Sequence, residues 1–229
     1  MTADARASAP EPTDVVIVDD HGLLAQSLTF ALRGDGLTVE RCRELTEDAI
    51  VEVVSSFRPE VVLLDLDLGG ELGSSLSVIP ALAATGSRVV MVTGVTDRVR
   101  LAECVQAGAI GVIAKSEPFE RLVDGVRRVV DDGQLLTRDQ RENYLAELRQ
   151  HRSAQRQQFE LFDQLTPREA QVLAGLVHGQ SAEQIAAEAF VSITTVRSQI
   201  RSVLSKLGVN SQLAAVALAS RSGWKLPVE

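Results

Sequence analysis

Residues 61–67 read VVLLDLD, a run of four apolar residues that ends directly at a carboxylate, Asp65. Residues 15–20 show the same arrangement as VVIVDD, with Asp19 and Asp20 at the end of the run. Short apolar runs rich in β-branched residues are typical of strands that are buried on both faces of a parallel sheet. The two stretches therefore predict strands of an α/β fold with carboxylates at their carboxyl ends.

The same kind of run recurs on either side of these two stretches. Further strands are predicted at residues 89–92 and 110–113, and a weaker one at 37–42. Helix-length stretches lie between the strands, at residues 22–32, 46–57, 74–84, 97–107 and 118–130. Five strand–helix units in about 120 residues predict a doubly wound, flavodoxin-like α/β domain with a five-stranded parallel sheet. Ligands of such folds bind beyond the carboxyl ends of the strands.

The remainder of the chain is predicted to be helical. Residues 138–162 are polar and lack Gly and Pro, so they indicate a solvated linker helix whose apolar ends dock on the two domains. Thr166, Pro167 and Glu169 form a capping box at the start of the next helix. Ser181 and Ser192 can cap two further helices separated by a short turn, which predicts a helix-turn-helix, and a last helix is expected from residue 212 to 221.

Composition and charge set the broad class of protein. Of the 229 residues, 45% are apolar and 24% are charged, which is typical of a globular protein and excludes a disordered chain. Residues 1–136 hold 12 Lys and Arg against 22 Asp and Glu, whereas residues 137–229 hold 11 against 9. The mildly basic second part is therefore the candidate for binding a polyanion. Cys42 and Cys104 are too few for a disulfide framework or a zinc site, so we expect two small core residues.

No apolar run approaches the roughly 18 residues that a membrane span needs. Residues 1–13 lack the basic start and the apolar stretch of a signal peptide. We therefore expect a cytoplasmic protein with no membrane partner, and a disordered leader at residues 1–13.

Five polar residues follow predicted strands and can share one edge of the sheet. Asp19, Asp20 and Asp65 would repel one another unless a cation were present, and oxygen ligands suit Mg²⁺. Thr93 follows the strand at 89–92, and Lys115 follows the last strand. A carboxylate nucleophile, a divalent ion, a hydroxyl donor and an ammonium group are what phosphoryl transfer to Asp65 requires. Taken singly, Asp20 and Thr93 could instead cap the helices that follow, and Lys115 could be a solvated strand end.

The stretches VVIVDDHGLL, VVLLDLDL, VVMVTG and GAIGVIAKS resemble the acid pair and the functional strands of response-regulator receiver domains. The resemblance implies that Asp65 is the phosphoacceptor and that Thr93 and Lys115 bind phosphoryl oxygens. It also implies that Asp19 and Asp20 bind Mg²⁺, together with Asp65 and the backbone carbonyl of Asp67.

Two positions depart from the pattern of this family. Val112 occupies the position that usually carries Tyr or Phe, which puts signalling through an aromatic ring in doubt. Gly69 replaces the usual Pro four residues after the phosphoacceptor, which indicates a looser loop beside the site. Neither change removes a metal ligand.

The helix that follows Ser192 has the features of a DNA-reading helix. Ile193, Val196, Ile200, Val203 and Leu207 form an apolar stripe at helical spacing and are expected in the core. The opposite face is basic and carries short side chains, as a major groove can admit, but its three cations alone could also belong to an ordinary solvated face.

Residues 165–219 resemble the LuxR/FixJ-type helix-turn-helix domain over their whole length. The resemblance implies that Arg197, Ser198 and Arg201 read bases and that the last helix forms a dimer surface. Phosphate contacts are implied for Thr195, Gln199 and Lys206.

Together the two resemblances indicate a NarL/FixJ-type response regulator: leader 1–13, receiver 14–133, linker helix 134–163 and helix-turn-helix domain 164–229. It would be a transcriptional regulator with no enzymatic turnover beyond phosphorylation and dephosphorylation of Asp65. The implied partners are a sensor histidine kinase, an inverted-repeat DNA operator, a second copy of the chain and RNA polymerase.

Two alternatives stay open from the sequence. One is a regulator that does not use phosphate and whose receiver serves dimerisation or ligand binding, which Val112 favours. The other is an aspartate-dependent phosphatase of the haloacid-dehalogenase type, because Asp65-Leu66-Asp67 resembles the first motif of that family. In that family the metal-binding acid pair comes last, whereas here the acid pair precedes Asp65.

Overall fold

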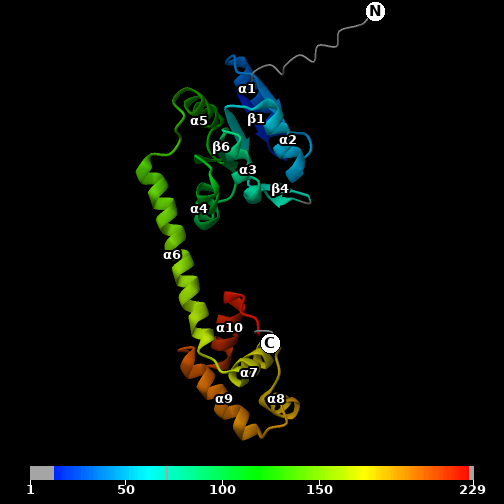
Figure 1. The fold of residues 1–229 in the computed structure, drawn as a ribbon, viewed down its shortest axis with the longest axis vertical. Coiled ribbons are helices and arrows are strands. Elements are labelled where there is room, and N and C mark those ends of the chain that lie inside the picture. The colour runs from blue at the N-terminus through cyan, green and yellow to red at the C-terminus, as the bar shows by residue number, and fades with distance from the viewer. Residues whose placement is uncertain (1–12, 71, 227–229) are drawn as a thin grey trace, which may run out of the picture. The chain divides into compact units, whose positions relative to one another are not determined.

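The computed structural model describes residues 13–70 and 72–226 (Figure 1). The chain divides into two compact units between Arg149 and Gln150. The leader predicted at residues 1–13 lies outside the described residues except for Thr13, which is buried. Among the described residues, no helix combines the length and the apolar character needed to cross a membrane.

The first unit is built on a five-stranded parallel sheet, as predicted. The strand order is β2-β1-β3-β6-β7, so the chain crosses over at β1 and is doubly wound. The strands are β1 (Val15–Val18), β2 (Val39–Arg41), β3 (Val61–Leu64), β6 (Arg88–Thr93) and β7 (Gly111–Ala114). Every residue of β1 and β3 is buried, because helices cover both faces of the sheet.

The helices of the first unit cover both faces of the sheet. They are α1 (Gly22–Gly34), α2 (Glu47–Phe57), η1 (Ser75–Ser77), α3 (Ile79–Ala84), α4 (Arg98–Ala107) and α5 (Phe119–Asp132). Helices α2, α3 and α4 contribute to one core cluster, through Ile50, Leu82 and Cys104 respectively. Helices α1 and α5 contribute to the other, through Leu28 and Val126. Both cysteines are free and buried, as predicted.

A short hairpin beside β3 was not predicted. It consists of β4 (Asp67–Gly69) and β5 (Gly73–Ser74), and it interrupts the chain before the third helix. Gly69 and Gly73 both have φ of 62°, a backbone conformation that glycine adopts without strain. A glycine-rich segment gives no strand signal in the sequence, which explains why the hairpin was missed.

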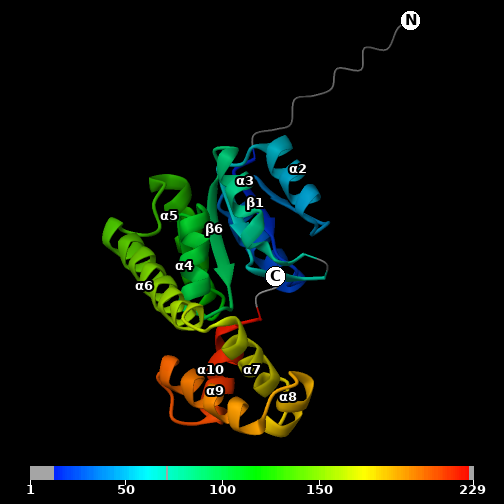
Figure 2. The same cartoon turned by 60° about the horizontal axis from the view of Figure 1, so that its bottom comes forward.

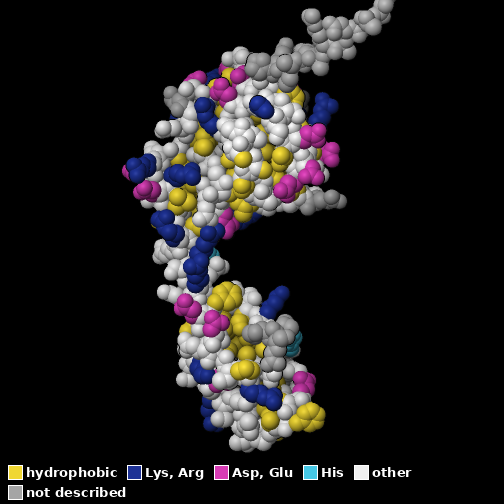
Figure 3. Space-filling model, viewed as in Figure 1, with side chains coloured by type: hydrophobic (Ala, Val, Ile, Leu, Met, Phe, Trp, Pro, Cys, Tyr) yellow, Lys and Arg dark blue, Asp and Glu magenta, His cyan; other side chains and the backbone are white. Residues whose placement is uncertain are grey.

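Helix α6 (Arg138–Asp163) begins as part of the first unit. Its early turns lie alongside α4 (Figure 2), where Leu148 is only 1% exposed and Arg141 donates to the carbonyls of Val105 and Ala109, each at 3.3 Å. Residues 149–160 are all exposed, and the basic side chains that Figure 3 shows along this part of the helix are arginines. Phe162 is buried again, within the core of the second unit. The prediction of buried ends and an exposed middle is therefore confirmed.

The second unit is all-helical after α6. Its helices are α7 (Pro167–Val177), α8 (Ala182–Glu188), α9 (Ile193–Lys206) and α10 (Gln212–Ser222). Thr166 with Glu169 forms the predicted capping box, and Ser192 accepts a hydrogen bond from the backbone N–H of Thr195 at the start of α9. Helices α8 and α9 with the turn between them form the predicted helix-turn-helix.

Candidate phosphoacceptor site and nucleic-acid interface

Asp19 and Asp65 lie side by side because the strands that precede them are paired. Val18 of β1 is in register with Leu64 of β3, so each carboxylate leaves the sheet at the same edge. The backbone N–H of Asp65 donates to the carbonyl of Val18 at 2.9 Å. Asp65 is 3% exposed and Asp19 is 7% exposed. Two acidic side chains are thus buried together, an arrangement that needs a positive partner.

Lys115 is that partner in this structure. Its Nζ lies 2.6 Å from Oδ2 of Asp65 and 2.8 Å from Oδ2 of Asp19. Burial opposes the charge of Lys115, but hydrogen bonds from its ammonium to Asp19 and Asp65 outweigh the burial and raise its pKa. The side chain is 14% exposed, so Lys115 is not a solvated strand end.

Thr93 stands at the same edge of the sheet, at the end of β6. It is in register with Ala114, and its carbonyl accepts the backbone N–H of Lys115 at 2.9 Å. Thr93 is 1% exposed, and its Oγ1 accepts the N–H of Val95 at 3.2 Å. The N-cap of α4 is Asp97, so Thr93 does not cap that helix.

Asp20 and Asp67 lie on the open side of the cluster. Asp20 does not cap α1, because the N-cap position is His21. A Cβ built on Gly69 would lie 3.2 Å from Oδ2 of Asp20, so the glycine keeps the hairpin clear of that carboxylate. The carboxylate of Asp67 receives the guanidinium of Arg100 from α4, at 2.6 and 3.3 Å. This leaves the backbone carbonyl of Asp67 as the group implied for the metal.

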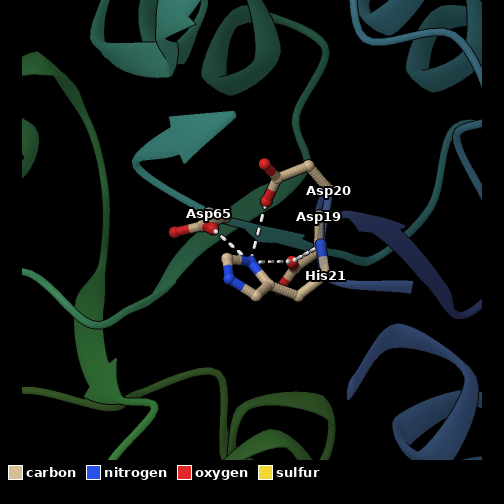
Figure 4. A group of neighbouring side chains, drawn as sticks. All are labelled: Asp19, Asp20, His21 and Asp65. Atoms are coloured by element: carbon tan, nitrogen blue, oxygen red, sulfur yellow. Dashed lines mark hydrogen bonds and ion pairs between the residues drawn. The ribbon is translucent and has the colours of Figure 1, made fainter. Parts of the chain in front are cut away.

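His21 is the residue of this site that the sequence analysis missed. Its Nδ1 lies 2.8 Å from Oδ1 of Asp20, and Figure 4 shows the ring among the three carboxylates. Asp19, Asp20, His21 and Asp65 each offer one ligand atom, and these atoms lie within 4.8 Å of one another. Such a set fits a divalent cation with oxygen-rich coordination.

The residues predicted to contact DNA all lie on α9, and most of them are exposed. Thr195, Arg197, Ser198 and Arg201 are exposed and Gln199 is half-buried. One guanidinium nitrogen of Arg197 lies 3.3 Å from Oε1 of Glu183 on α8. Ile193, which was expected in the core stripe, is 41% exposed because it is the first residue of the helix. The rest of the stripe is buried as predicted.

Lys206 has a different environment from the arginines of α9. Its Nζ donates to Oε2 of Glu169 at 2.6 Å and to the carbonyl of Gln164 at 3.0 Å. Burial of Glu169 would raise its pKa, but hydrogen bonds from Lys206, Ser202 and Thr166 outweigh the burial and lower the pKa to about 2. The ammonium of Lys206, which was predicted to contact a DNA phosphate, is therefore also a hydrogen-bond donor within the polar cluster around Glu169.

Comparisons with known proteins agree with both halves of this description. Residues 15–127 match the family model of the response regulator receiver domain, and residues 163–219 match that of bacterial regulatory proteins of the luxR family. The chain is 31% identical over 208 residues to a nitrate/nitrite response regulator protein homolog of Haemophilus influenzae, covering 89% of this chain and 94% of that protein. It is 28% identical to the probable transcriptional regulatory protein NarL of Mycobacterium tuberculosis, covering 93% and 95%. Among solved structures it is similar to RcsB of Salmonella typhimurium, with 19% identity, coverage of 92% and 98%, and a TM-score of 0.48.

The doubly wound sheet with its carboxylate cluster and the helix-turn-helix define a receiver domain joined to a LuxR-type DNA-binding domain. The chain belongs to the NarL/FixJ group of two-component response regulators and is a DNA-binding transcriptional regulator.

Proposed function

We propose that Asp65 accepts a phosphoryl group from the phosphohistidine of a sensor kinase, in a reaction that depends on Mg²⁺. The observation that carries the proposal is the contact of Lys115 with both Asp65 and Asp19. A lone ammonium group neutralises only part of the charge of three carboxylates, so the site retains an affinity for a divalent cation. The same cation would neutralise the charge that develops on the transferring phosphoryl group.

The chain's own residues divide the chemistry among them. A carboxylate oxygen of Asp65 attacks phosphorus, a new O–P bond forms, and the N–P bond of the donor breaks. The donor imidazole leaves with the electron pair of that bond and takes up a proton. The ammonium of Lys115 donates a hydrogen bond to Oδ2 of Asp65 in this structure. After the transfer it would donate to a phosphoryl oxygen instead, and the hydroxyl of Thr93 would be a second donor.

Asp19, Asp20 and Asp65 would hold the magnesium ion, with the backbone carbonyl of Asp67 as a further ligand. The mass of the intact protein after incubation with acetyl phosphate and Mg²⁺ tests the proposal. We expect one added phosphoryl group, which is absent without Mg²⁺ and absent in Asp65→Asn. A label on another residue would refute the assignment.

The DNA-binding half would act as a dimer on an inverted-repeat operator. Arg197, Ser198 and Arg201 are exposed on α9 and would read bases, while Thr195, Gln199 and Lys206 would contact phosphates. Leu213 on α10 is 79% exposed, which suits the use of that helix as a dimer surface. Recruitment of RNA polymerase and a cytoplasmic location belong to the same proposal.

A phosphate-independent regulator is the second candidate, and Val112 is the observation that favours it. Val112 is partly buried against the core cluster formed with α2, α3 and α4. It offers no aromatic ring that could turn inward after phosphorylation. DNA binding that is equal in the wild type, in phosphorylated protein and in Asp65→Asn would support this candidate.

We propose no enzymatic turnover beyond phosphorylation and dephosphorylation of Asp65 itself. Repeated hydrolysis of para-nitrophenyl phosphate would instead favour the phosphatase alternative.

A further inference from the structure

His21 places a ring nitrogen among the oxygens of the carboxylate cluster (Figure 4). Its Nδ1 lies 2.8 Å from Oδ1 of Asp20, 3.4 Å from Oδ1 of Asp19 and 3.7 Å from Oδ2 of Asp65. The imidazole is 64% exposed, so its position is not explained by packing in the core. The backbone N–H of the same residue donates to Oδ1 of Asp19 at 2.7 Å, which fixes the histidine beside the acid pair.

These separations match the ligand shell of a small divalent ion. With ligand distances of about 2.1 Å, adjacent ligands of an octahedron are roughly 3.0 Å apart and opposite ligands roughly 4.2 Å apart. The three distances from Nδ1 of His21 to carboxylate oxygens run from 2.8 to 3.7 Å. The nitrogen therefore stands near the distance of a neighbouring ligand from the carboxylates of Asp20 and Asp19, and between the neighbouring and the opposite distances from that of Asp65.

The hydrogen-bonding partners of this nitrogen also conflict with one another. Nδ1 lies 3.1 Å from Nζ of Lys115, an ammonium group that can only donate, so this contact needs a free lone pair on Nδ1. The contact with Oδ1 of Asp20 needs a proton on the same nitrogen. No single state of Nδ1 satisfies both neighbours, whereas a cation among these groups is a partner for the lone pair and for the carboxylate.

We infer that His21 is a nitrogen ligand of the receiver's divalent-cation site, and that it shifts the selectivity of the site from Mg²⁺ towards later transition-metal ions. The inference rests on the cation site of the proposed function. Magnesium prefers oxygen ligands, whereas imidazole favours ions such as Ni²⁺, and affinity for a nitrogen-containing site rises from Mn²⁺ to Ni²⁺.

Pulsed electron paramagnetic resonance on the full chain loaded with Mn²⁺ tests the ligand directly. We expect a coupling to the ¹⁴N nucleus of a coordinated imidazole in the wild type and its loss in His21→Ala. His151→Ala is the matched control, because it removes an exposed histidine from the middle of α6, and it should retain the coupling. A wild-type spectrum without nitrogen coupling, or a coupling that persists in His21→Ala, would overturn the inference.

The selectivity of the site for different ions is a second, independent test of the role of His21. Titrations with Ni²⁺ and with Mg²⁺ should show that His21→Ala weakens Ni²⁺ binding by about tenfold or more and Mg²⁺ binding by much less. Equal weakening of both ions would contradict a role in selectivity. Thermal unfolding of metal-free His21→Ala, compared with that of the metal-free wild type, shows that the variant is folded. Phosphorylation of Asp65 in the wild type with Mg²⁺ tests the proposed function separately.

Discussion

Arg98 on α4 and Glu147 on α6 form a two-point ion pair, with Nε to Oε2 and Nη2 to Oε1 both at 2.8 Å. The guanidinium of Arg98 also stands over the ring of Tyr144, 4.9 Å from its centre. One residue therefore makes a polar and an aromatic contact with the start of α6. The early turns of that helix are part of the receiver and touch the helix that follows the Thr93 strand.

We expect the burial of Leu148, the next residue of α6, to matter more than the ion pair. Leu148→Ala removes a side chain that is 1% exposed and should cost about 2 to 5 kcal/mol of stability. Glu147→Gln breaks a solvent-exposed pair and should cost less than about 1 kcal/mol. Hydrogen exchange across residues 138–149 measures both changes. Greater loss of protection in Glu147→Gln than in Leu148→Ala would contradict this ranking.

Lys115→Met should increase the stabilisation of the receiver by Mg²⁺. The ammonium group occupies the carboxylates of Asp65 and Asp19, so it competes with a cation for the same oxygens. Without it, adding Mg²⁺ should raise the melting temperature by more than in the wild type, while the yield of phosphorylated protein falls. Lys225→Met is the control, because Lys225 lies in the other unit and is exposed. An unchanged response to Mg²⁺ in Lys115→Met would count against the competition.

Glu183→Gln should strengthen DNA binding by freeing Arg197. The carboxylate of Glu183 lies 3.3 Å from the guanidinium of Arg197. Its pKa is lowered mainly by hydrogen bonds from its own backbone N–H and from Ser181, and to a smaller extent by Arg197. Glu188→Gln removes the same charge from the end of the same helix and controls for general electrostatics. Binding titrations at matched salt should show a larger gain for Glu183→Gln. Equal gains would mean that the ion pair does not compete with DNA.

Arg201→Ala should lose sequence discrimination, because bidentate recognition of guanine by arginine is worth about 1 to 3 kcal/mol. The comparison is made between a DNA site selected from a random pool and a scrambled version of that site. A loss of affinity that is equal on both DNAs would assign Arg201 to phosphate contact instead.

The second unit should lose stability in acid through Glu169. Its pKa of about 2 in the folded state lies below the ordinary value of 4.5, so the ionised carboxylate stabilises the fold. This contribution is complete above about pH 4.5, declines as the pH falls towards 2, and is of the order of 2 kcal/mol after allowance for solvent screening. Trp224, the single tryptophan, stacks on Phe162 at 5.4 Å and reports unfolding of this unit by fluorescence.

Glu169→Gln is the matched variant, and its stability should depend less on pH in this range. Lys206→Met should likewise destabilise this unit, because it leaves the buried Glu169 without its ammonium partner. A pH dependence in Glu169→Gln equal to that of the wild type would assign the acid sensitivity to other carboxylates.

The strand signals predicted the position of the carboxylate cluster, because parallel strands place their carboxyl ends at one edge of the sheet. Asp65, Asp19 and Lys115 could be assigned to this edge from the sequence alone. His21 could not, since its approach to the carboxylates depends on the backbone between β1 and α1 and on an exposed side chain. A histidine directly after an acid pair was the only available signal.

Two distant ion pairs that do not lie at strand ends were equally beyond prediction. Lys206 and Glu169 are 37 residues apart, and Arg98 and Glu147 are 49 apart. Charge alone assigned Lys206 to DNA, because helical periodicity does not show which neighbouring helix supplies a carboxylate. Caps were more informative, since Thr166, Ser181 and Ser192 bond to residues three positions ahead in the chain.

The exposed middle of α6, residues 149–160, has a consequence for the kinetics of the chain. These 12 residues are all exposed, so burial in a hydrophobic core contributes little to their helical order. Isolated helices of this length are marginal in water, and helix–coil relaxation takes about 0.1 to 1 μs. Phosphoryl transfer by kinases turns over at about 1 to 100 s⁻¹. The segment is therefore expected to sample helix and coil many times within one signalling event. Substitutions such as Gln155→Gly or Gln155→Ala should change its helical fraction without touching either hydrophobic core.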